Sequence, residues 1–103
     1  MREVINKLES ELGIPFYYVS REKGQAPVIV YNYKKELNMS DMKKESASYD
    51  FYFILIINEN INITVENFEE VLINNFFRNI TVNQSSTTKE NYVQISITAS
   101  KNI

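Results

Sequence analysis

The sequence contains no cysteine and no histidine. Without cysteine the chain has no disulfide framework and no thiolate chemistry. Without histidine it lacks the commonest general base and the commonest metal-binding side chain. Its two glycines, Gly13 and Gly24, are far apart, so a glycine-rich phosphate-binding loop is excluded. We therefore expect a protein that is not an enzyme, with no catalytic residue, no cofactor and no metal.

Length and net charge indicate how many domains the chain forms and which partners it is unsuited to bind. The 103 residues correspond to one domain, residues 1–103. A net charge of −2 does not favour a protein that binds nucleic acid or an anionic membrane. The first six residues are too charged to begin a signal peptide. We expect a protein that is made and kept in a cytoplasm.

The longest apolar and aromatic run lies at mid-sequence, over residues 48–57. Its residues are aromatic or β-branched, without glycine or proline, which is typical of a strand. One face of that strand would carry the odd-numbered residues, and we predict that this face is core. It comprises Tyr49, Phe51, Phe53, Leu55 and Ile57. The even-numbered face is polar at both ends and apolar in the middle, which indicates partial cover by something else.

Apolar residues recur at helical spacing over residues 2–12 and 65–77, which predicts two amphipathic helices. Gly13 is suited to end the first helix. Asn62 or Thr64 is the expected N-cap of the second helix. Its predicted core stripe comprises Val65, Phe68, Leu72 and Phe76.

Shorter strands are predicted on both sides of the central one, at residues 16–19, 28–33, 79–83 and 92–99. In the last two strands the inward residues would be Ile80, Val82, Val93, Ile95, Ile97 and Ala99. The order α-β-β-β-α-β-β predicts an α+β fold. We expect a mostly antiparallel sheet of about five strands, with the two helices packed on one face.

A polar segment at residues 34–47 joins the second predicted strand to the central one, and it is long for a hairpin loop. We expect it to be mobile in the free subunit and to contact a neighbouring molecule through its lysines. Alternatively, the flanking strands extend into it as a protruding arm. Its lysine pairs are more typical of solvated surface than of an RNA-binding site. They are Lys34, Lys35, Lys43 and Lys44.

The acidic side chains of the sequence do not form a candidate catalytic site. Glu66, Glu69 and Glu70 cluster on the second predicted helix, with no histidine or cysteine to assist them. A solvated helix face that suits the helix dipole is the favoured interpretation.

The outward face of the central strand is the best candidate for an interface. If Ile54 and Ile56 were both left in water, the fold would lose roughly 3–6 kcal/mol of hydrophobic stabilisation. A subunit interface and cover by the chain's own segments are equally favoured. The candidate interface residues are Tyr31, Tyr33, Tyr52, Ile54 and Ile56.

The order of these segments resembles small tail-completion or tail-terminator proteins of tailed bacteriophages and prophage-derived particles. The residues that carry the resemblance are a helix stop at Leu12-Gly-Ile-Pro15, a proline-led strand at Pro27-Val-Ile-Val-Tyr31, and the long Tyr/Phe strand from Tyr49 to Ile57. A charged loop, a second helix and two closing strands complete the pattern, which covers most of the chain.

The resemblance implies a structural protein that forms a ring, often of six subunits, and caps the tail tube at the head-tail junction. Its partners would be further copies of itself, the tail tube protein and the head connector protein. It would be located in the virion tail and be assembled in the cytoplasm of the bacterial host. The alternative is a small cytoplasmic protein-binding module, such as an adaptor or an immunity-like protein.

Overall fold

The structure is a computed structural model. It describes residues 1–20, 26–40, 43–83, 85–88 and 91–103, and the side chains of residues 38–40 and 43–46 also lie outside the described part. Within these residues the elements are α1 (Arg2–Leu12), β1 (Phe16–Tyr18), β2 (Val28–Ser40), β3 (Lys43–Ile57), α2 (Ile61–Asn74), β4 (Arg78–Val82), β5 (Ser86–Thr87) and β6 (Val93–Asn102).

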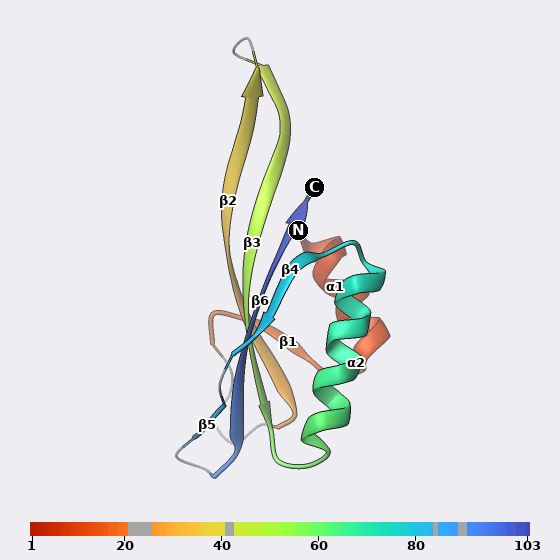
Figure 1. The fold of residues 1–103 in the computed structure, drawn as a ribbon, viewed down its shortest axis with the longest axis vertical. Helices are drawn as coiled ribbons and strands as arrows, with labels where there is room; N and C mark the ends of the chain where they lie inside the picture. Colours follow the sequence, from red (N-terminus) through yellow and green to blue (C-terminus); the bar gives the residue numbers. More distant parts are fainter. Residues whose placement is uncertain (21–25, 41–42, 84, 89–90) are drawn as a thin grey trace.

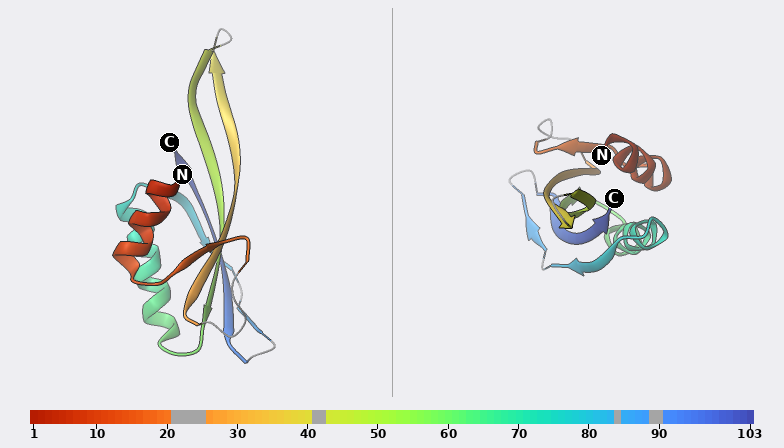
Figure 2. Two further views of the ribbon diagram at one scale, coloured as in Figure 1. Left: turned by 180° about the vertical axis from the view of Figure 1, so that it is seen from behind. Right: turned by 90° about the horizontal axis from the view of Figure 1, so that it is seen from above.

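The described strands form one mixed sheet in the order β1-β2-β3-β6-β4, and β5 pairs with β6 (Figure 1). Both helices lie side by side on one face of the sheet (Figure 2). The predicted α+β class is therefore confirmed. The predicted sheet lacked β5 and did not anticipate that β1 pairs with β2 in parallel. A three-residue strand carries too little pattern to fix its direction.

The odd-numbered face of β3 forms the core, as predicted. Phe51, Phe53 and Leu55 are completely buried beneath the helices. The ring of Phe53 meets that of Phe68 from α2 edge-on, with 5.1 Å between the centroids. The fully buried residues of the two helices are Leu8, Phe68 and Leu72.

Helix α1 has the predicted bounds and the predicted stop. Gly13 adopts the left-handed conformation with φ 76°, and its N–H donates to the Glu9 carbonyl at 2.8 Å. The Glu9 carboxylate in turn accepts a hydrogen bond from the backbone N–H of Phe16 at 2.8 Å. This side chain therefore ties the last turn of α1 to the first residue of the sheet.

Helix α2 differs from its prediction at both ends. It begins at Ile61, with Asn60 as the N-cap, so Asn62 and Thr64 lie inside the helix. The Thr64 hydroxyl donates to the Asn60 carbonyl at 2.8 Å. At the other end the predicted core residue Phe76 is 84% exposed, and Phe77 is buried in its place. The chain leaves the helix at Asn75, and this exit turns Phe77 rather than Phe76 toward the core.

The predicted link at residues 34–47 is part of a paired hairpin, which confirms the alternative of a protruding arm. Cross-strand pairing runs from Lys34 opposite Asp50 to Ser40 opposite Lys43. The arm projects beyond the helices along the long axis of the molecule, whose extents are 51 × 24 × 24 Å (Figure 1). At its base Ala47 and Ile103 exchange two backbone hydrogen bonds, of 3.3 and 2.9 Å.

The closing strands follow the prediction in β6, and in β4 they follow it for direction but not for burial. Residues of β6 alternate as expected, with Ile95, Ile97 and Ala99 buried. In β4, Ile80 packs partly against the core, whereas Val82 is 41% exposed. Val82 pairs with Ile97 at the edge of the sheet, where the cover by α2 is incomplete. Val82 is exposed because β4 is an edge strand, and the sequence pattern does not show which strands lie at the edge.

The two faces of β3 give a direct test of this core. We expect Phe53→Ala to lower the free energy of unfolding by about 3–5 kcal/mol, because it leaves a cavity between sheet and helices. Its neighbour Tyr52 is 48% exposed on the opposite face. Tyr52→Ala should cost less than about 1 kcal/mol. Urea denaturation of both variants makes the comparison, and equal losses would contradict the assignment of faces.

Candidate interaction site

The outward face of β3 becomes more exposed along its length toward the arm. Ile56 is 5% exposed, Ile54 is partly buried and Tyr52 is 48% exposed. Ile56 lies opposite Val28 on β2, and Val28 is buried as well. The chain therefore covers Ile56 by itself, and only Ile54 and Tyr52 of the three predicted residues remain accessible.

Tyr31 and Tyr33 were expected to share this face, and that expectation is wrong. They lie opposite Phe53 and Phe51 in the β2–β3 register, so their side chains belong to the helix-covered face. The Tyr31 ring lies 6.4 Å from that of Phe16, and the Tyr33 ring 5.9 Å from that of Phe51. In this antiparallel register, odd-numbered residues of β2 lie opposite odd-numbered residues of β3. Their side chains therefore lie on the same face of the sheet.

A shallow hollow of about 250 Å³ opens beside Ile54, and it is also lined by Tyr31 and Asn32. We name four of its apolar residues the outer-face patch. They are Val19, Val30, Tyr52 and Ile54. Val19 is 58% exposed and has φ 69°. A β-branched residue at positive φ is a genuine conformational outlier. The backbone thus holds an apolar side chain in water at some cost in conformational energy. We did not predict from the sequence that Val19 would be both exposed and strained.

Of the four predicted lysines, the structure describes the side chains of two. Lys34 and Lys35 are exposed at the base of the arm, and Lys34 lies opposite Asp50 in the strand register. The Lys35 ammonium lies 5.8 Å from the centre of the Tyr49 ring. The side chains of Lys43 and Lys44 lie outside the described residues.

Helix α2 ends in a Schellman motif with an unusual residue at its left-handed position. The N–H of Phe77 donates to the Leu72 carbonyl and the N–H of Phe76 to the Ile73 carbonyl, both at 3.0 Å. Phe76, the middle one of the three residues between α2 and β4, has φ 65°, where glycine is the usual choice. A side chain in this region costs roughly 1–2 kcal/mol. The motif thus presents a strained phenylalanine to solvent.

A buried asparagine fixes this helix end to its neighbours. Asn75 is 6% exposed, and its side-chain amide donates to the Glu11 carboxylate at 2.5 Å and to the Val71 carbonyl at 2.7 Å. The Lys101 ammonium donates to the Asn75 carbonyl. It also lies 5.6 Å from the centre of the Phe76 ring. Contacts from α1 and β6 therefore hold the turn that carries Phe76.

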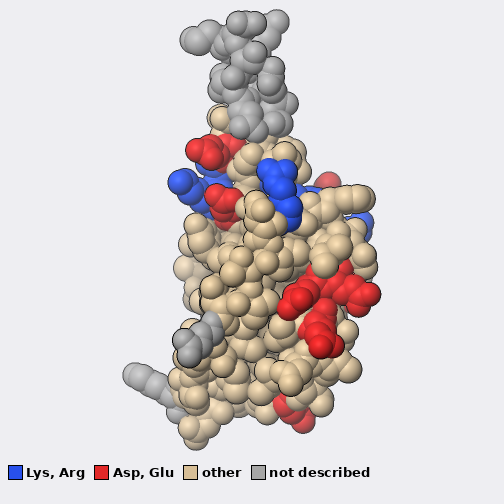
Figure 3. Space-filling model, viewed as in Figure 1, with Lys and Arg blue, Asp and Glu red and all other residues tan. Residues whose placement is uncertain are grey.

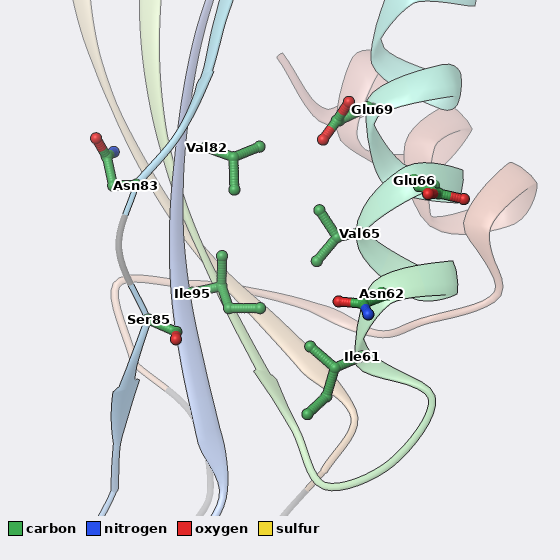
Figure 4. Close-up of a pocket in the computed structure, with 9 residues that line it drawn as sticks. All are labelled: Ile61, Asn62, Val65, Glu66, Glu69, Val82, Asn83, Ser85 and Ile95. Carbon is green, nitrogen blue, oxygen red and sulfur yellow. The ribbon is translucent and has the colours of Figure 1, made fainter.

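A larger groove, of about 410 Å³, separates the first turns of α2 from the sheet edge; we call it the α2 groove (Figure 4). Ile61 and Val65 point from the helix across the gap toward Val82 and Ile95 (Figure 4). Glu69 points into it from the next turn. The remaining lining residues are Asn62, Glu66, Asn83 and Ser85. The groove is thus an apolar trough with the Glu69 carboxylate on its helix side.

Charge is unevenly distributed over the two ends of α2. In Figure 3 acidic side chains gather over the helix, whereas the visible lysines and arginines lie toward the arm. A hollow of about 200 Å³ lies beside Phe76. Its charged lining residues, among those that the structure describes, are Lys7, Lys101 and Glu3. Burial lowers the pKa of Lys101, and the charge of Lys7 lowers it further.

Neither a metal centre nor a membrane span is found in the part of the chain that the structure describes. There, no three Asp, Glu, His or Cys side chains are placed to hold a metal ion. No helix among the same residues is long and apolar enough to cross a membrane. The chain matches no protein-family model and shows no significant similarity to a curated protein.

The buried side of β2 gives a pH prediction. Burial raises the pKa of the Tyr31 hydroxyl above its usual 10.0, and the neighbouring Tyr33 and Tyr18 raise it further. The folded state therefore keeps this proton at a pH where the unfolded chain has lost it. The resulting stability is fully present below pH 10.0 and declines as pH rises toward the folded-state pKa.

Replacing the hydroxyl tests this linkage. Tyr31→Phe keeps the ring, and we expect the free energy of unfolding to fall less steeply with pH above about pH 10 than in the wild type. Urea denaturation at closely spaced pH values measures the slope. Lys101 contributes with the opposite sign, because its pKa is lowered, and it is present in both proteins. Identical slopes would contradict the prediction.

Proposed function

We propose that this protein is a self-assembling structural subunit of the tail-terminator or tail-completion type, which forms a ring that caps the tail tube of a phage or phage-like particle. The observation that carries the proposal is the β2–β3 arm. A protein that acts alone gains little from a hairpin that extends beyond its own core. A subunit of a ring uses such an arm to reach its neighbours.

The backbone of the arm supports this interpretation. Strand β1 pairs with β2 only as far as Tyr31, so among the described residues the outer edge of β2 has no strand beside it over residues 32–40. That is roughly 30 Å of strand edge without a neighbouring strand, on which the Tyr33 N–H donates to the Asn32 side chain at 2.8 Å. A two-stranded ribbon is marginally stable by itself, and an open edge is a template for pairing with another chain. Leu37, on the arm, is 49% exposed.

The outer-face patch supplies a second argument for association. Val19 and Tyr52 are both about half exposed, and Ile54, which lines the same hollow, is only partly buried. Apolar side chains that meet in this way on a subunit surface are typical of interaction sites. Strain at Val19 adds weight, because strained residues persist where they serve a function.

Assembly itself is the first test. We expect the purified protein to form closed rings, visible by negative-stain electron microscopy, and the particle to need it for joining heads to tails. Particles produced without the protein should accumulate as separate heads and tails, and adding the purified protein should restore joining. A one-to-one complex with an unrelated protein, with no rings, would favour the adaptor or immunity-like alternative.

The outer-face patch gives a second test. We expect Ile54→Lys to keep the fold but weaken self-association by at least about tenfold, because an unpaired charge in an interface is costly. Sedimentation velocity measures association, and thermal unfolding checks the fold.

Two matched variants complete this test. Ile63→Lys introduces the same charge at an isoleucine on α2 that is 58% exposed, and it should leave association unchanged. Ile56→Lys places the charge at a buried position and should destabilise the subunit itself. If Ile54→Lys associates like the wild type, the patch is not an interface.

A further inference from the structure

Phe76 combines strong exposure with backbone strain. Its side chain is 84% exposed and its φ is 65°. Glycine would close the same Schellman motif without strain, so the helix stop does not require phenylalanine. The surrounding contacts of Asn75 and Lys101 hold the turn in place. The structure therefore presents a fixed aromatic knob, whose ring is contacted by the Lys101 ammonium but otherwise open to solvent within the described part of the chain.

The α2 groove has the dimensions and lining to receive such a ring. A dry cavity of about 150 Å³ already holds a benzene molecule, and this groove measures about 410 Å³. Its apolar surface comes from Ile61, Val65, Val82 and Ile95. Val82 is 41% exposed, so the groove is open to an incoming side chain.

The charges around knob and groove are complementary. Lys7, Lys101 and Glu3 line the hollow beside Phe76, so the side chains around the knob carry an excess of positive charge. Glu66 and Glu69 line the groove, the Glu69 side chain points into it (Figure 4), and none of the described lining residues is a lysine or arginine. An ammonium group that enters with the ring would meet the Glu69 carboxylate at a partly desolvated edge, where electrostatic attraction favours one orientation.

The knob cannot fill the groove of its own subunit. Phe76 lies eleven positions after Val65, which corresponds to about 16 Å along a helix axis. We propose that Phe76 of one copy inserts into the α2 groove of a second copy of this chain. This contact joins two different surfaces, so repetition gives a closed ring or an open filament. The inference rests on the proposed function in assuming self-assembly, and it names the surfaces that meet.

Two variants each disable one half of the contact. Phe76→Gly removes the knob and relieves the left-handed strain. It should therefore raise the melting temperature while leaving the protein monomeric at concentrations where the wild type associates. Glu69→Lys keeps the knob but reverses the charge at the groove, and association should fall at least about tenfold. Ile63→Ala, at an exposed α2 residue that does not line the groove, is the matched control and should associate normally.

Mixing the variants is the decisive experiment. The Phe76→Gly protein retains an intact groove, and the Glu69→Lys protein retains an intact knob. With Ile54→Lys added to both proteins to remove association through the outer-face patch, an equimolar mixture should form a one-to-one dimer in sedimentation velocity and grow no further, although neither protein forms a dimer alone at that concentration.

The outcomes separate this inference from the proposed function. If the wild type associates and Phe76→Gly associates equally well, the knob contact is wrong and the self-assembling function stands on other surfaces. If the wild type stays monomeric at every concentration, both are wrong. A mixture that remains monomeric also overturns the contact. A lower melting temperature for Phe76→Gly would overturn the argument that the knob is strained.

Discussion

Burial of one face of β3 is the constraint on which the rest of the structure depends. Phe51, Phe53 and Leu55 must be covered, and two short helices suffice to cover only that side of the sheet. The opposite face is therefore left to the chain's own edges and to solvent. Ile56 and Val28 are buried there, outside the main core cluster, while Tyr52 is left half exposed. The accessible apolar surface thus follows from how the core is arranged.

Much of this arrangement could be predicted because it follows from periodicity. The odd-numbered face of β3, the whole of α1 with its Gly13 stop, and the alternation of β6 depend on local pattern, and all were predicted correctly. The direction of β1 and the exposure of Val82 depend on which strands are neighbours, and a single sequence does not report this. Tyr31 and Tyr33 were assigned to the wrong face because the register between strands was unknown.

The helix end at Asn75 shows why candidate sites are harder to predict than cores. Phe76 and Phe77 are adjacent and chemically identical, and helical spacing favoured Phe76 for the core. One residue in the left-handed conformation reverses their roles. Glycine or asparagine would have signalled that conformation, whereas phenylalanine conceals it. Val19 escaped notice for the same reason. Side chains that oppose their local backbone preference leave no trace in sequence pattern, and here both lie on accessible surfaces.

The paired backbone groups of Ala47 and Ile103 have a consequence for protein engineering. Strand β6 runs antiparallel to β3, so a peptide fused after Ile103 would be guided along the edge of β3 toward the outer part of the arm. A fused segment of alternating β-branched residues would convert the two-stranded ribbon into a three-stranded one. Such a graft would stiffen the arm and cover one of its edges, without altering a single residue of the core.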